Sequence, residues 1–143
     1  MSVATTVLAF DFGEKRIGVA VGDTGVRIAH PLSTIHAEDN ATRFAEIAKL
    51  IAEWQPARLI VGLPMHADGA EHEVSRLARR FAQRLEGRFG LPAVLVDERL
   101  TSRAAESRLL ESGARARDVE DVLDAHAARE ILQAWLETIA ATP

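Results

Sequence analysis

Three acidic positions in this sequence could cooperate in chemistry. Asp11 ends one apolar run, Asp97 and Glu98 end another, and Asp124 lies in a helical segment near the end of the sequence. A set of carboxylates suits a hard cation such as Mg²⁺ or Mn²⁺, because these ions prefer oxygen ligands. Two such ions can activate a water molecule and stabilise the leaving oxygen of a phosphodiester. The residue types therefore point to metal-dependent hydrolysis of a phosphodiester bond.

Asp124 occupies an unusual position for a carboxylate. Apolar residues follow it at i+3, i+4, i+7 and i+8, so it lies on the core-facing stripe of its helix. A carboxylate there costs free energy unless it is paired or bound to a metal. An ion pair with Arg99 or Arg103 is the alternative to a metal.

The strand-end carboxylates also have structural interpretations. A single aspartate such as Asp11 commonly caps a strand or forms a turn. Successive side chains of a strand point to opposite faces, so Asp97 and Glu98 should not both face Asp11. We therefore expect one of these two to be structural.

Changes in hydrophobic period predict the elements that position these residues. Strands are expected at residues 7–10, 16–21, 27–35, 59–63 and 93–96. Helices are expected from a cap at Asp39 or Asn40 to Pro56, from Val74 to a stop at Gly87 and Gly90, from Thr101 to about Ser112, and from Asp118 to about Ile139.

This order predicts an α/β fold with a five-stranded mixed sheet, in which the first three strands form a meander and helices cover both faces. Right-handed crossovers place the first strand beside the fourth. Asp11, Pro64 and the pair Asp97-Glu98 then meet at the sheet edge where open α/β sheets bind their ligands. No repeat or linker divides the chain, so residues 1–143 are expected to form a single domain.

Composition narrows the function further. The chain has no Cys, which excludes disulfides and thiolate metal sites, and no apolar run reaches the ~20 residues that a membrane span needs. With no secretory signal in the sequence either, we expect a cytoplasmic protein without a membrane partner. The net charge is −4, yet residues 76–117 contain 10 basic and 5 acidic residues. This basic segment predicts either a local anion-binding surface or a solvated arginine-rich helix face.

Four motifs resemble the YqgF/RuvX family. They are DFGEKRIGVAVGD at 11–23, VGLP at 61–64 with a following DG at 68–69, DERLTS at 97–102 and DAHAA at 124–128. The resemblance spans nearly the whole chain. It implies an RNase H-like fold of three layers, related to the Holliday junction resolvase RuvC.

The resemblance also implies a function and a site. The activity would be a metal-dependent endonuclease that matures the 5′ end of pre-16S ribosomal RNA during ribosome biogenesis. The catalytic carboxylates would be Asp11, Glu98 and Asp124, and these would bind Mg²⁺ or Mn²⁺, as two ions, with Asp97 as a candidate fourth ligand. Lys15, Arg16, Arg99 and Arg103 are the candidate phosphate contacts. The partner would be the RNA or the pre-ribosomal small subunit, and the protein a monomer or weak homodimer.

Three other functions remain open from the sequence. Branched DNA as the substrate would keep the chemistry, but resolvases cut symmetrically as dimers. A non-catalytic nucleic-acid-binding module would bind RNA without cleaving it. An actin-like ATPase or sugar kinase opens with a similar Asp-x-Gly hairpin, but it clamps ATP between two such domains and this chain has the length of one.

Overall fold

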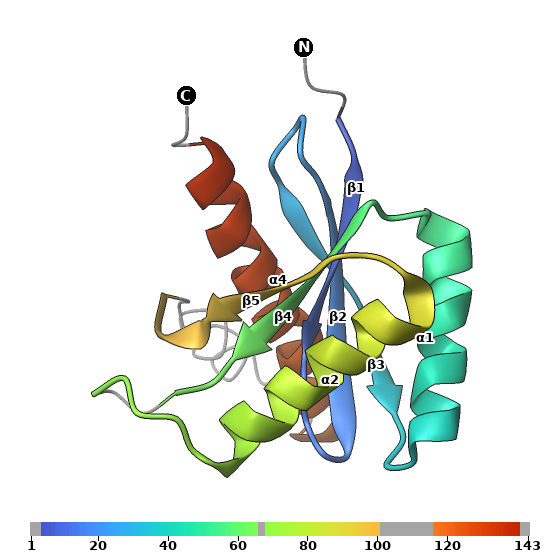
Figure 1. Ribbon diagram of the computed structural model, residues 1–143, viewed down its shortest axis with the longest axis vertical. Helices are drawn as coiled ribbons and strands as arrows, with labels where there is room; N and C mark the ends of the chain where they lie inside the picture. Colours follow the sequence, from blue (N-terminus) through green and yellow to red (C-terminus); the bar gives the residue numbers. More distant parts are fainter. Residues whose placement is uncertain (1–3, 66–67, 101–115, 141–143) are drawn as a thin grey trace.

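A five-stranded mixed sheet forms the centre of the protein (Figure 1). The computed structural model describes residues 4–65, 68–100 and 116–140. The strands are β1 (Thr6–Asp11), β2 (Arg16–Asp23), β3 (Ala29–His36), β4 (Arg58–Leu63) and β5 (Ala93–Asp97), and they lie in the order β3-β2-β1-β4-β5. The first three pair antiparallel, whereas β4 is parallel to both β1 and β5. The predicted meander and the central place of β1 beside β4 are confirmed.

Three helices flank the sheet in the described part of the chain. They are α1 (Asn40–Trp54), α2 (Glu73–Phe89) and α4 (Ala116–Ala140), and a short 3-10 turn, η1 (Glu98–Leu100), follows β5. The Asp39 side chain accepts a hydrogen bond from the Thr42 N–H and caps α1, as predicted. Gly90 ends α2 in the left-handed region at φ 65°.

One predicted helix end is wrong, and one predicted helix cannot be compared with the structure. The stop predicted at Gly87 is wrong, because Gly87 lies inside α2. A glycine within a helix costs only about 1 kcal/mol, and Leu85 and Phe89 on the buried face offset that cost. The helix predicted from Thr101 to Ser112 lies outside the described residues. Among the helices that are described, none is long and apolar enough to cross a membrane.

The two faces of the sheet are covered by different helices (Figure 1). Leu8 and Phe10 of β1 belong to a buried cluster with residues of α1 and α2. Val7 and Ala9 belong to a second cluster, which is formed with α4. Because strand side chains alternate, Asp11 continues the series of Val7 and Ala9 and faces α4.

Helix α4 lies against the sheet at Gly18 of β2. A Cβ atom on Gly18 would lie 1.9 Å from the backbone oxygen of Asp124, so no larger residue fits there. Gly18 is also the register partner of Asp11 on β1. The close approach of α4 therefore brings Asp124 to the part of the sheet that carries Asp11.

This contact gives a prediction about stability. Gly18→Ala should lower the free energy of unfolding by about 1–3 kcal/mol or more, because α4 must move away from the sheet. The matched control is Gly87→Ala in α2, where a Cβ meets no atom within 4 Å. That control should be stabilised by about 0.5–1 kcal/mol. Urea unfolding measures both, and equal effects of the two substitutions would contradict the close-contact interpretation.

Candidate active site

Asp11 lies at the end of the central strand, on the face that α4 covers. The pKa of Asp11 is raised to about 8, first by burial and then, in order of importance, by the charge of Glu98, a hydrogen bond with Glu98 and the charge of Asp124. The protonated Asp11 carboxyl donates the hydrogen bond that it shares with Glu98. The three carboxylates expected from the sequence therefore influence one another in the structure.

Glu98 reaches Asp11 because Gly62 of β4 leaves room for its side chain. A Cβ atom on Gly62 would lie 3.1 Å from Cγ of Glu98 and 2.4 Å from Cδ1 of Ile131 on α4. Side chains alternate between the two faces along β5, and Val96 faces α4. Glu98 lies two positions after Val96, so its side chain points to the same face.

Asp97 points elsewhere and pairs with Arg99. Its carboxylate accepts a hydrogen bond from the Arg99 backbone N–H at 2.9 Å, and Arg99 Nη2 lies 2.6 Å from Oδ2. The side-chain and backbone hydrogen bonds from Arg99 lower the pKa of Asp97. Of the two adjacent carboxylates, the structure brings Glu98 to Asp11 and leaves Asp97 to hold the turn after β5.

Asp124 forms an ion pair with Arg16, a partner that was not predicted from the sequence. Arg16 Nε donates to Asp124 Oδ2 at 2.7 Å, and both side chains are partly exposed. Arg16 begins β2 and faces α4 in the same series as Gly18. Arg99 pairs with Asp97 instead, and Arg103 lies outside the described residues.

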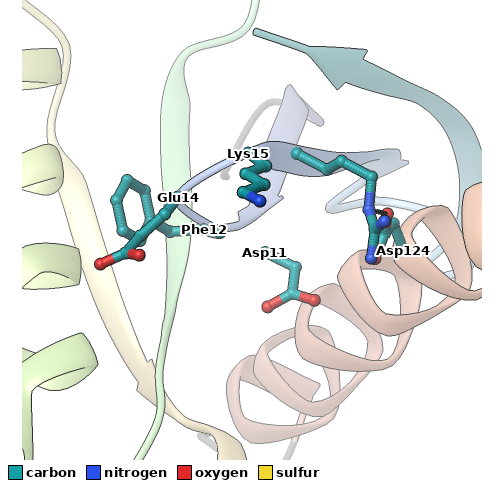
Figure 2. Close-up of a pocket in the computed structure, with 7 residues that line it drawn as sticks. Asp11, Phe12, Glu14, Lys15 and Asp124 are labelled. Atoms are coloured by element: carbon teal, nitrogen blue, oxygen red, sulfur yellow. Dashed lines mark hydrogen bonds and ion pairs between the residues drawn. The ribbon is translucent and has the colours of Figure 1, made fainter. Parts of the chain in front are cut away.

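The side chains of Asp11 and Asp124 lie in a cleft that is partly open to solvent (Figure 2). Its volume is about 190 Å³, and it is lined by Asp11, Asp124 and residues 12–16. Figure 2 shows Lys15 extending over the Asp11 side of the cleft, while Phe12 and Glu14 point away from Asp11. A cleft with carboxylates below and an ammonium group above can receive a phosphate group together with cations.

Arg43 of α1 was not among the residues predicted from the sequence. This side chain is only 4% exposed, and its guanidinium donates to the backbone oxygens of Ala37, Gly13 and Glu14. It also lies over the ring of Phe12, at 5.4 Å from the centroid. Arg43 is three positions after Asn40 and shares the buried stripe of Ile47, a signal of the same kind as the one that identified Asp124.

The basic segment forms an exposed helix face in the described part of the chain. Five arginines of α2 are exposed: Arg76, Arg79, Arg80, Arg84 and Arg88. Arg76 pairs with Glu73 and Arg79 with Glu71. Arg88 lies over the Phe44 ring at 4.3 Å.

Comparison with solved structures identifies the class of fold. The structure of Thermus thermophilus RuvC matches with a TM-score of 0.58 at 12% identity, over 96% of this chain and 97% of RuvC. RuvC of the same species in complex with a Holliday junction substrate matches equally well, with a TM-score of 0.58 and 13% identity over 96% of each chain. The protein thus has the α/β architecture of RuvC, an RNase H-like fold.

Sequence comparison then gives the family. The model described as "RuvX: Holliday junction resolvase" matches residues 5–138, and the chain belongs to this family. A Dechloromonas aromatica relative is 61% identical over 93% of this chain and 91% of its own length. A Chromobacterium violaceum relative is 60% identical over 91% of this chain and 96% of its own. Both relatives carry the name "Putative pre-16S rRNA nuclease".

The raised pKa of Asp11 gives a prediction about pH. The folded protein holds this proton up to about pH 8, whereas the unfolded chain loses it near the ordinary value of 3.8. Without metal, the contribution of Asp11 to stability is therefore complete below the unfolded value. It falls as the pH rises to about 8, by up to about 1.4 kcal/mol per pH unit.

Asp11→Asn should remove this loss, so that at about pH 8 and above the variant unfolds at higher urea concentration than the wild type. Urea unfolding in chelator at several pH values measures the difference. A variant that is less stable than the wild type throughout this range would instead make Asp11 a structural residue.

Proposed function

We propose that this protein is a metal-dependent endonuclease that processes the 5′ end of pre-16S ribosomal RNA. The observation that carries the proposal is the Asp11–Glu98 carboxyl pair, with Asp124 beside it on α4, at the carboxyl edge of the sheet. The names of the close relatives support RNA as the substrate. A role on ribosomal RNA would place the protein in the cytoplasm, and one copy of the site would suffice for a single cut by a monomer or weak homodimer.

The donor set fits Mg²⁺ or Mn²⁺. In residues 4–65, 68–100 and 116–140, no three acidic or histidine side chains are spaced as the ligands of one ion. Asp11 and Glu98 nevertheless share a hydrogen bond through a proton that a divalent cation can replace, and all the donors are carboxylate oxygens. Asp11, Glu98 and Asp124 would hold one or two ions, and these would supply activation of water and stabilisation of the leaving oxygen.

The cationic side chains around the cleft would bind and orient the substrate. Lys15 lies over the cleft and would contact a non-bridging oxygen of the scissile phosphate. Arg16 neutralises Asp124 and can exchange this carboxylate for a phosphate oxygen when a cation takes its place. Arg99 lies against Gly69, with Nη1 at 3.2 Å from an added Cβ, and would contact a neighbouring phosphate from the other side of β5.

Branched DNA is the second candidate substrate. The family description names Holliday junction resolvases, and the RuvC fold is seen in complex with such a junction. Metal-dependent cleavage assays on pre-16S RNA, pre-ribosomal particles and a four-way DNA junction separate the two. Specific cleavage at the 5′ end of the 16S sequence supports the proposal, whereas symmetric cutting of the junction by a dimer supports the alternative.

Substitution of the three carboxylates tests the site. Asp11→Asn, Glu98→Gln and Asp124→Asn should each lower the cleavage rate by orders of magnitude, and a double variant should lose little more than a single one, because the residues act as a unit. Asp97→Asn is the matched control, since this carboxylate pairs with Arg99. It should retain most activity, and near-normal cleavage by Asp124→Asn would remove the helix carboxylate from the mechanism.

Metal binding should also be visible without any substrate. Mg²⁺ or Mn²⁺ should raise the melting temperature of the wild type, because a ligand that binds only the folded state stabilises it. Asp11→Asn should lose most of this response, whereas Asp97→Asn should keep it. An equal response in all three proteins would place the ion elsewhere.

The arginines of α2 would extend the RNA-binding surface beyond the cleft. Arg80 and Arg84 are exposed and lie about 6 Å apart along the helix. On single-stranded RNA, Arg80→Gln with Arg84→Gln should reduce the slope of log affinity against log salt by about 1.4. Arg27→Gln with Arg58→Gln makes the same change in net charge in the β2–β3 connection and at the start of β4, neither of which lines the cleft. Equal slopes for the two double variants would contradict a local contact.

A further inference from the structure

The β1–β2 turn is held from one side by a single buried side chain. Nη2 of Arg43 donates to the backbone oxygen of Gly13 at 2.7 Å and also to that of Glu14, and Nε donates to that of Ala37 at 2.6 Å. The Ala37 N–H in turn donates to the Lys15 oxygen at 3.2 Å. The backbone oxygens of Gly13, Glu14 and Lys15 therefore all accept hydrogen bonds from α1 or from the segment that precedes it.

These bonds determine where the amides of the turn point. The structure contains no cis peptide bond among the described residues. In a trans peptide the C=O and the following N–H point in opposite directions. Since the oxygens of Gly13 and Glu14 both point to Arg43, the N–H groups of Glu14 and Lys15 both point away from it.

The direction away from Arg43 leads to the carboxylate side of the sheet. Arg43 belongs to α1, which covers the face of Leu8 and Phe10, and its guanidinium lies over Phe12. The opposite face carries Asp11 and α4. The turn residues 12–16 line the cleft together with Asp11 and Asp124. Among the described residues, the N–H groups of Glu14 and Lys15 have no hydrogen-bond acceptor.

We propose that the N–H groups of Glu14 and Lys15 form a phosphate-binding site together with the Lys15 ammonium, and that Arg43 is the positioning residue that holds this site open. Neighbouring amides with parallel N–H groups bind anions through their combined dipoles. The ligand class is a phosphate or phosphodiester oxygen. The inference deepens the proposed function, because it assigns the part of the nuclease site that would hold the scissile phosphate.

The site differs from a simple contact with Lys15. An ammonium group on a flexible stem attracts a phosphate but does not fix its orientation. Two amides in a turn that Arg43 holds rigid give the phosphate a defined position relative to Asp11. Loss of Arg43 should therefore impair binding at the turn without removing any group that touches the phosphate.

The test is a titration of the metal-free, ¹⁵N-labelled protein with inorganic phosphate. In the wild type, the amide resonances of Glu14 and Lys15 should shift together and saturate. In Arg43→Lys, which keeps the charge but loses the planar fork, the affinity should fall by about tenfold or more. Arg58→Lys is the matched control, because Arg58 also lies over an aromatic ring, that of Trp135, but contacts none of the turn oxygens. It should bind phosphate as the wild type does.

Lys15→Gln separates the amides from the ammonium group. The amide shifts should persist in this variant at lower affinity. The inference is overturned if phosphate leaves both amides unmoved in the wild type, if Arg43→Lys binds as tightly as the wild type, or if Lys15→Gln abolishes every shift. The wild-type titration decides the question even if Arg43→Lys does not fold.

The same proteins distinguish this inference from the proposed function. Phosphate shifts without any RNA cleavage would support the binding site and contradict the nuclease. RNA cleavage with unmoved amides would support the nuclease and overturn the binding site. If both hold, Arg43→Lys should raise KM for RNA more than it lowers kcat, while a merely structural role would lower the amount of folded enzyme and leave KM unchanged.

Discussion

The contact between Gly18 and the backbone of α4 is the constraint on which the rest of the site depends. With no side chain at Gly18, α4 lies so close to β2 that the Asp124 backbone takes the place of a Cβ atom. Gly18 pairs with Asp11 across the β1–β2 ladder, so one backbone contact sets the relation between two carboxylates that are far apart in the sequence. Gly62 acts in the same way on the neighbouring strand, where it gives Glu98 room beside Ile131.

Such an arrangement of carboxylates is costly, and the structure shows how the cost is reduced. At an effective dielectric constant of about 20, two charges about 5 Å apart repel each other by roughly 3 kcal/mol. The raised pKa of Asp11 removes one of these charges at neutral pH, and the ion pair with Arg16 offsets another. Both compensations are reversible, because a proton can leave and a guanidinium can rotate. As proposed, bound divalent cations would replace both compensations, and Arg43 would keep the phosphate side of the cleft in position.

Much of the fold could be predicted from the sequence, because it follows from local patterns. Apolar runs ending at Asp11 and Asp97 marked the strands, Asp39 marked the start of α1, and the crossover rule placed β1 beside β4. The stop assigned to Gly87 was wrong because packing of the buried face of α2 outweighs the weak helix propensity of one glycine. The strand alternation predicted that one of Asp97 and Glu98 would be structural, but only the register with β4 shows which one.

The partners of charged residues were harder to predict, since they depend on tertiary contacts. Asp124 was recognised by its position on an apolar helical stripe, yet its partner Arg16 comes from a strand at the other end of the chain. Arg43 carried a similar signal, one turn before Ile47, but its role depends on backbone oxygens, which have no sequence signature. The helix expected at 101–112, and Arg103 within it, lie outside the described residues.

The most direct test of the central claim is the location of Mn²⁺ in crystals of the protein, by anomalous scattering. We expect an anomalous peak within coordination distance of carboxylate oxygens of both Asp11 and Glu98, with the Asp124–Arg16 ion pair opened toward the ion. An ion bound away from Asp11, or a protein that takes up no Mn²⁺ while the Asp11–Glu98 hydrogen bond persists, would contradict the claim that these carboxylates form a metal-dependent nuclease site.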